Sequence, residues 1–207
     1  PSQSGKEKQH YGPKVNFNKR KMNAATFRGL PAYARDLEAR LRARVRQDVA
    51  LRRSEDRALE DALREFETTD AFVLRYSPTE ASNLDFHLDD RFAYGELILD
   101  LSLESDSVLT FLRGRPYGEV ETCPGRGQGP VCVRVPLPAR SMAVLYGPAR
   151  LEWEHAILAY DIEARRTSIT LRTLGAALRQ TEAGRAVLER SRLDLDATDP
   201  GPSPPRA

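Results

Sequence analysis

Alternating apolar and polar positions dominate the chain from residue 71 onward. Leucines occupy every second position from 97 to 103, and valines every second position from 131 to 135. Short segments of this kind, separated by turn residues, are typical of the strands of a β-sandwich or barrel. The pattern predicts about eight strands, at residues 72–76, 84–89, 97–103, 107–113, 131–135, 141–146, 151–157 and 166–172.

The preceding segment, residues 31–70, has helical spacing instead. Leu37, Leu41 and Val45 recur every four residues, and no Gly or Pro interrupts the segment after Pro31. Its nine basic and ten acidic residues are interleaved, which favours an exposed, salt-bridged helix over a nucleic-acid groove. The apolar stripe thins around residues 52–57, where we expect a break or a solvent-exposed section.

Charge and composition distinguish the two ends of the chain. Residues 1–30 carry seven basic side chains and one acidic one, although the net charge of all 207 residues is only +2. Such an arm attracts phosphate or an acidic partner, unless it is a solvated leader. We divide the chain into a basic N-terminal arm or lid (1–30), a helical segment packing on the core (31–70), a β-rich core (71–173), a C-terminal helix (174–192) and a disordered tail (193–207).

The overall composition narrows the compartment. Charged residues make up 30% of the chain, and no apolar run of about 18 residues is present, so we expect no membrane span. Two cysteines, Cys123 and Cys132, are too few for a disulfide framework and lack zinc-site spacing. We therefore expect a reducing compartment, the nucleus or the cytoplasm.

Two histidines and one aspartate have the residue types of a metal site. His87 and Asp89 are two residues apart in a strand-like segment, so their side chains lie on one face. His155 belongs to a second strand-like segment. Two histidines and one carboxylate that leave three positions open form the facial triad of non-haem Fe(II) oxygenases. Spacing alone also permits a structural or surface role for His87 and Asp89.

The last predicted strand places two arginines on one face. Arg166, Ser168, Thr170 and Arg172 alternate with apolar or small residues, and the two arginines lie roughly 20 Å apart along the strand. Guanidinium groups bind carboxylates through paired hydrogen bonds, so inward arginines would suit a dicarboxylate co-substrate. An edge strand with both arginines directed to solvent is the alternative.

These segments together resemble a known family. Gly147–Ile157 followed by Arg165–Arg172 looks like the C-terminal signature of the AlkB-type Fe(II)/2-oxoglutarate dioxygenases. Residues 11–17, 83–90 and 135–141 look like the AlkB homologue 4 subfamily. The resemblance implies a mainly β fold with flanking helices (α+β), namely a double-stranded β-helix (jelly-roll) core with a long N-terminal helical segment.

The resemblance also implies the cofactors and their ligands. Fe(II) and 2-oxoglutarate are expected to bind, with O2 as co-substrate. Arg166 is expected to pair with the distal carboxylate of 2-oxoglutarate, and Arg172 to lie near its iron-chelating end. The implied iron ligands are His87, Asp89 and His155, and the implied co-substrate ligands are Tyr76, Arg166, Ser168 and Arg172.

The implied reaction is oxidative demethylation that releases formaldehyde from an N-methyl group. The subfamily is associated with N6-methyladenine in DNA and with methyl-lysine on actin. We expect a monomer that acts on methylated nucleic acid, DNA rather than RNA; the alternatives are a methyl-lysine protein such as actin, a protein hydroxylase on the same iron site, and a binding module without turnover. The candidate substrate-binding residues, by charge and aromatic stacking, are Tyr11, Lys14, Phe17, Lys19, Arg20, Lys21, Phe92 and Tyr94, of which the last two equally suit a core.

Overall fold

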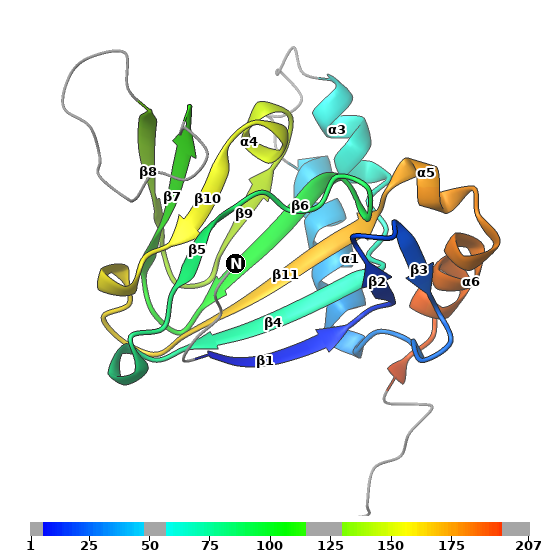
Figure 1. Cartoon of the computed structure of the whole chain (residues 1–207), viewed down its shortest axis with the longest axis horizontal. Coiled ribbons are helices and arrows are strands. Elements are labelled where there is room, and N and C mark those ends of the chain that lie inside the picture. The colour runs from blue at the N-terminus through cyan, green and yellow to red at the C-terminus, as the bar shows by residue number, and fades with distance from the viewer. Residues whose placement is uncertain (1–5, 48–56, 115–129, 196–207) are drawn as a thin grey trace, which may run out of the picture. The chain divides into compact units, whose positions relative to one another are not determined.

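The computed structural model describes residues 6–47, 57–114 and 130–195 (Figure 1). They divide into two compact units. Unit 1 comprises Pro1–Gln9, Val73–Asp89 and Leu99–Thr170, and unit 2 comprises His10–Phe72, Asp90–Ile98 and Leu171–Ala207. Both units are discontinuous in sequence because several strands run from one into the other.

All eight strands expected from the hydrophobic pattern form, and three further strands form within the basic arm. Residues 151–153 differ from the prediction, because Pro148 starts a short helix there and the strand begins only at Glu154. The predicted loop at 114–130 falls largely outside the described residues. The strands are β1 (Lys6–Tyr11), β2 (Lys14–Asn16), β3 (Lys21–Asn23), β4 (Asp70–Tyr76), β5 (Leu84–His87), β6 (Tyr94–Leu103), β7 (Ser107–Arg113), β8 (Val131–Leu137), β9 (Ser141–Leu145), β10 (Glu154–Ile157) and β11 (Arg166–Leu174).

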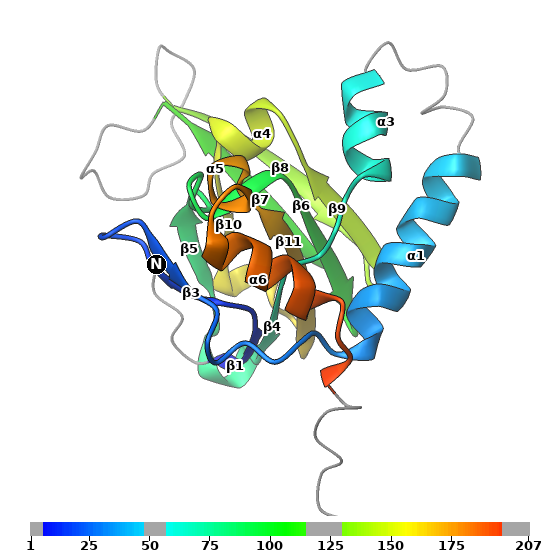
Figure 2. The same cartoon turned by 90° about the vertical axis from the view of Figure 1, so that its right-hand side faces the viewer.

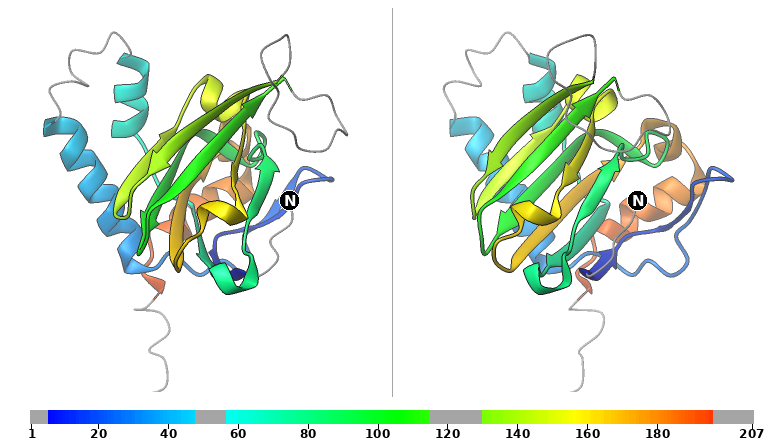
Figure 3. Two further views of the ribbon diagram at one scale, coloured as in Figure 1. Left: turned by 90° about the vertical axis from the view of Figure 1, so that its left-hand side faces the viewer. Right: turned by 60° about the vertical axis from the view of Figure 1, so that its left-hand side comes forward.

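The strands form three sheets. The five-stranded sheet has the order β1-β4-β11-β6-β9, so β11 is a central strand. The four-stranded sheet, β5-β10-β7-β8, lies wholly within unit 1, and its neighbouring strands are antiparallel. Within unit 1 this sheet and the unit's portions of the five-stranded sheet form two layers (Figure 3). The third sheet is the hairpin of β2 and β3 in unit 2.

The predicted helical segment contains two helices, α1 (Ala32–Gln47) and α3 (Arg57–Arg64), with residues 48–56 outside the described ones. The two helices lie alongside each other in unit 2 (Figure 2). Val45 and Leu63 are buried, and the charged residues between the apolar positions are mostly exposed or half-buried. The interleaved charges therefore belong to helices that bury only a narrow apolar stripe.

The predicted C-terminal helix is two helices, α5 (Ala176–Arg179) and α6 (Glu182–Ser191). Thr181 separates them, and its side-chain oxygen accepts a hydrogen bond from the Gly184 amide at 3.0 Å, which caps α6. The other short helical segments are α4 (Pro148–Leu151) and the 3-10 turns Pro78–Glu80 and Ala159–Asp161. Among the described residues, no helix combines the length and apolarity needed to cross a bilayer.

Candidate metal and co-substrate site

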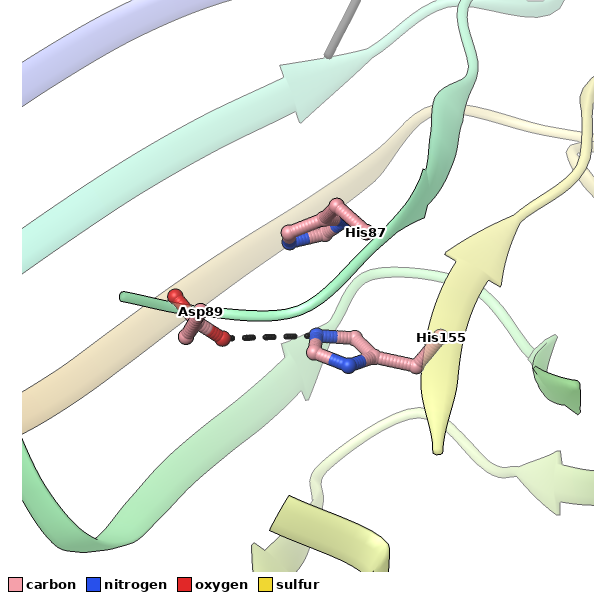
Figure 4. Close-up of side chains that lie close together, drawn as sticks. All are labelled: His87, Asp89 and His155. Carbon is pink, nitrogen blue, oxygen red and sulfur yellow. Dashed lines mark ion pairs between the residues drawn. The ribbon is translucent and has the colours of Figure 1, made fainter. Parts of the chain in front are cut away.

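Three side chains of unit 1 gather as the facial-triad hypothesis requires. Each of His87, Asp89 and His155 offers one ligand atom, and these atoms all lie within 4.8 Å of one another. In Figure 4 the His155 ring points at the Asp89 carboxylate, and the His87 ring lies close to both. Two imidazoles and one carboxylate brought together in this way can hold a divalent transition metal.

The pairing of β5 with β10 brings the two histidines together. The strands are antiparallel, and the Cα atom of His155 is the partner of the Cα atom of His87. Residues directly opposite each other on antiparallel strands project to the same face of the sheet. Their ring centroids are accordingly 4.4 Å apart. Asp89 joins them because it comes two residues after His87, where β5 has ended.

Hydrogen bonding leaves the ligand nitrogens free to bind an ion. The Nδ1 atom of His87 lies 2.8 Å from the backbone carbonyl oxygen of Asp85. Nδ1 is the donor in this pair, because a carbonyl oxygen only accepts, so the lone pair of His87 is on Nε2. The Nε2 atom of His155 lies 3.4 Å from Oδ2 of Asp89. Ligand atoms about 2.1 Å from one ion, at right angles, are about 3 Å apart, so this pair suits neighbouring positions on one ion.

Arg150 is a residue of this site that the sequence analysis gave no role. It is 1% exposed, and its Nη1 atom donates a hydrogen bond to the backbone carbonyl oxygen of Asp89 at 2.8 Å. The bond holds the chain in place just after β5, where no strand pairing does so. The available signal was an arginine within the matched Gly147–Ile157 segment, but its partner was not readable from spacing.

Arg166 is fully buried among side chains of three neighbouring strands of unit 1. Its Nε atom donates to Ser102 Oγ on β6 at 2.9 Å, and its guanidinium carbon lies 5.1 Å from the centroid of the Tyr76 ring on β4. The Tyr76 hydroxyl in turn hydrogen-bonds with Ser168 and Arg166. Because β11 is central and Arg166 is 0% exposed, the edge-strand alternative for this arginine is excluded.

This group of side chains fits the carboxylate of a co-substrate. The Nη1 atom of Arg166 is buried and has no hydrogen-bond partner in the structure. A buried donor without an acceptor is costly, and a carboxylate oxygen would satisfy it. Burial raises the pKa of Tyr76 to about 12, with the positive charge of Arg166 acting against this shift and Asp100 adding to it. At neutral pH the Tyr76 hydroxyl therefore keeps its proton and can donate to the same carboxylate.

Arg172 has a carboxylate partner within the protein. In unit 2 its Nη1 atom lies 3.1 Å from Oδ1 of Asp70, and its guanidinium lies over the rings of Tyr94 and Phe72. The other carboxylate oxygen of Asp70 is 2.5 Å from Nε2 of His10. Asp70 is thus held from two sides by residues far apart in sequence. The role of Arg172 as a co-substrate ligand stays a prediction.

The predicted substrate-binding residues all belong to unit 2. We call residues 14–23, which contain β2, β3 and the turn between them, the basic hairpin. Lys14, Phe17, Lys19, Arg20 and Lys21 are exposed on it, and Phe17 is 49% exposed. The remaining three, Tyr11, Phe92 and Tyr94, are half-buried.

One contact joins the basic hairpin to a predicted aromatic residue. The guanidinium carbon of Arg20 lies 5.5 Å from the centroid of the Phe92 ring, within the range of a cation–π contact. Phe92 is therefore neither a fully buried core residue nor an open stacking platform.

Comparisons with known proteins agree with the site. No family model matches the chain. It is 36% identical to alpha-ketoglutarate-dependent dioxygenase alkB homolog 4 of Homo sapiens, over 90% of the chain and 64% of that protein. It is 29% identical to a DNA N6-methyl adenine demethylase of Caenorhabditis elegans, over 83% of the chain and 50% of that protein. The chain thus spans less than two thirds of the length of these relatives.

A solved structure supports the fold assignment. The structure of OsALKBH1 superposes with a TM-score of 0.52 at 12% identity, covering 84% of this chain and 81% of that one. At this identity the likeness concerns the fold alone. It confirms the expected mainly β, jelly-roll architecture with flanking helices.

The metal assignment predicts the effect of removing one ligand. In the His155→Ala variant, Fe(II) or Mn(II) affinity should fall by more than about 100-fold, because even outer-shell partners of metal ligands contribute 10–100-fold. Anaerobic titration calorimetry measures this directly. His10→Ala is the matched control, since His10 contacts Asp70 of unit 2 rather than the triad. Equal metal affinity in the two variants would contradict the assignment.

The raised pKa of Tyr76 predicts a pH-dependent stability term. As pH rises from about 10 to 12, the unfolded chain loses the tyrosine proton before the folded chain does, so the free energy of unfolding falls. The loss is at most about 3 kcal/mol for a shift of this size. Urea unfolding at about pH 9 and pH 11 should show a smaller loss in Tyr76→Phe than in the unaltered protein. Identical losses would show that the hydroxyl ionises as easily in the folded state.

Proposed function

The chain is an AlkB-like protein related to alkB homolog 4, and we propose that it is the catalytic core of an Fe(II)- and 2-oxoglutarate-dependent demethylase. The observation that carries the proposal is the convergence of His87, Asp89 and His155. Alpha-ketoglutarate dependence is part of the name of the human relative. The unfilled hydrogen-bonding capacity of buried Arg166 supports the same co-substrate here.

The side chains of unit 1 divide the work of binding. His87, Asp89 and His155 hold the ion from one side and leave its other positions open. Arg166 and Tyr76 bind the distal carboxylate of the co-substrate, the first by charge and the second by its hydroxyl proton. Because both are buried, these interactions are stronger than they would be in water. Bound Fe(II) and 2-oxoglutarate supply the oxidation of an N-methyl group, which is then lost as formaldehyde.

We propose N6-methyladenine in DNA as the substrate. The nematode relative bears that substrate in its name. The basic hairpin presents Lys14, Lys19 and Lys21 to solvent, and such cations bind phosphates without reading sequence. The exposed ring of Phe17 on the same hairpin can stack on an unpaired base. An adenine in a duplex must leave the base stack to reach a buried iron site, so single-stranded or locally opened DNA is favoured.

A substrate panel tests the proposal. Purified protein with Fe(II), 2-oxoglutarate and O2 is given oligonucleotides containing N6-methyladenine, or peptides containing methyl-lysine, and both succinate and formaldehyde are measured. Equimolar formaldehyde and succinate with the oligonucleotides is the expected result, and His155→Ala is the matched inactive control. Formaldehyde from the peptides alone would identify a methyl-lysine demethylase, and succinate without formaldehyde a hydroxylase.

Charge reversal in the basic hairpin should weaken DNA binding. The variant Lys19→Glu, Arg20→Glu, Lys21→Glu should lower oligonucleotide affinity and reduce the slope of log K against log salt by up to about 3, because each lost phosphate contact contributes about 0.9. Fluorescence anisotropy at several salt concentrations measures both quantities. Turnover of 2-oxoglutarate without substrate should be unchanged.

A matched control separates local contacts from a general charge effect. Arg40, Arg44 and Arg46 are exposed on α1, and reversing all three changes the net charge by the same amount. If this variant loses as much DNA affinity as the hairpin variant, the hairpin has no special role. If neither variant changes affinity or salt slope, the DNA proposal loses its electrostatic support and a protein substrate becomes the better one.

A further inference from the structure

An acidic side chain already occupies part of the guanidinium of Arg166. The Nη2 atom of Arg166 lies 3.2 Å from Oδ2 of Asp100 on β6. The other carboxylate oxygen of Asp100 accepts a hydrogen bond from Thr170 Oγ1 at 3.1 Å. The Asp100 side chain is only 14% exposed, so water screens this ion pair little. Of the three guanidinium nitrogens, Nη1 alone lacks a protein partner.

This arrangement limits how a ligand carboxylate can bind. Carboxylates bind arginine best through two parallel hydrogen bonds. A ligand that approaches Nη1 cannot also take Nη2 while Asp100 holds it. The Arg166–Asp100 pair has no net charge, and a ligand carboxylate beside it would be repelled by the Asp100 carboxylate. The pocket therefore attracts dicarboxylates less than a lone buried arginine would.

Orientation of Arg166 does not require Asp100. Ser102 accepts from Nε, and the Tyr76 ring lies against the guanidinium. The contribution that only Asp100 makes is negative charge, which compensates the buried guanidinium when the co-substrate is absent. The same charge stabilises the unliganded protein and opposes binding of a second carboxylate.

We propose that Asp100 is a positioning residue that acts through Arg166 and competes with the distal carboxylate of the co-substrate, which lowers the affinity of the site for dicarboxylates. The proposal rests on the proposed function, since it takes 2-oxoglutarate as the co-substrate. Succinate, the product, carries the same distal carboxylate, so Asp100 weakens its binding too. The residue thereby acts on both co-substrate capture and product release.

Neutralising this carboxylate tests the proposal. Asp100→Asn keeps the shape and an oxygen that can accept from Thr170 but removes the charge. Titration calorimetry of the Mn(II)-loaded protein should give about tenfold tighter binding of 2-oxoglutarate and succinate, which is the scale of one nearby charge. Binding of 2-oxobutyrate, which has no distal carboxylate, should be unchanged. This difference between ligands would not arise from a merely structural role.

Glu104→Gln is the matched control. Glu104 follows β6, and its carboxylate pairs with Arg165 at 3.0 Å and accepts from Thr167 Oγ1 at 2.9 Å, rather than contacting Arg166. The substitution removes one negative charge and should leave all three affinities unchanged. Asp100→Ser provides a second variant, with the same expected gain, if the asparagine variant does not fold.

The outcomes separate the inference from the function on which it rests. Unchanged or weaker 2-oxoglutarate binding in the Asp100 variants, with measurable binding by the unaltered protein, overturns the inference alone. An equal gain for 2-oxobutyrate also overturns it, because the effect would then not involve the distal carboxylate. Absence of 2-oxoglutarate binding in every form of the protein overturns the proposed function and the inference together.

Discussion

Charge that is removed from water must be compensated inside the protein, and this constraint shapes both units of the chain. In unit 1, Arg166 is fully buried and is held by Ser102, Asp100 and the Tyr76 ring. In unit 2, Asp70 is 2% exposed and meets Arg172 on one side and His10 on the other. Leaving a buried charge without its partner costs several kcal/mol, so these pairs restrict which side chains can be neighbours.

The same constraint links stability to co-substrate binding. In the unliganded protein, Arg166 keeps one buried donor unsatisfied while Asp100 supplies its counter-charge. A ligand carboxylate would satisfy the donor but would add a second negative charge to the pair. Affinity for a dicarboxylate is then the difference between these two effects. A residue remote from the metal ligands in sequence thereby influences how the proposed reaction begins and how its product leaves.

The metal site depends on strand register rather than on any single motif. His87 and His155 meet because β5 and β10 pair with these two residues opposite each other. A slip of one residue would direct one of the histidines to the other face of the sheet. Arg150 supports the third ligand by donating to the backbone of Asp89. The triad is thus held by backbone pairing on two ligands and by a buried arginine on the third.

Much of this protein was readable from its sequence. Period-two alternation predicted the eight strands of the core, because side chains of a strand point alternately to its two faces. The same rule placed His87 and Asp89 together, and Arg166 with Ser168. The helical spacing at residues 31–70 predicted α1 and α3, although not their separate bounds.

Only the tertiary structure decided which distant residues became partners. The position of His155 opposite His87, the contact of Arg150 with Asp89, and the pairing of Asp100 with Arg166 join residues 61 to 68 positions apart. Periodicity describes how a segment divides its own side chains between two faces, and it says nothing of which other segment covers each face. In the strand at 97–103 the leucines marked one apolar face, but Asp100 and Ser102 on the other face were also covered, because β11 brought the charge of Arg166 to them. Burial of that charge, a property of the assembled sheet, determined their role.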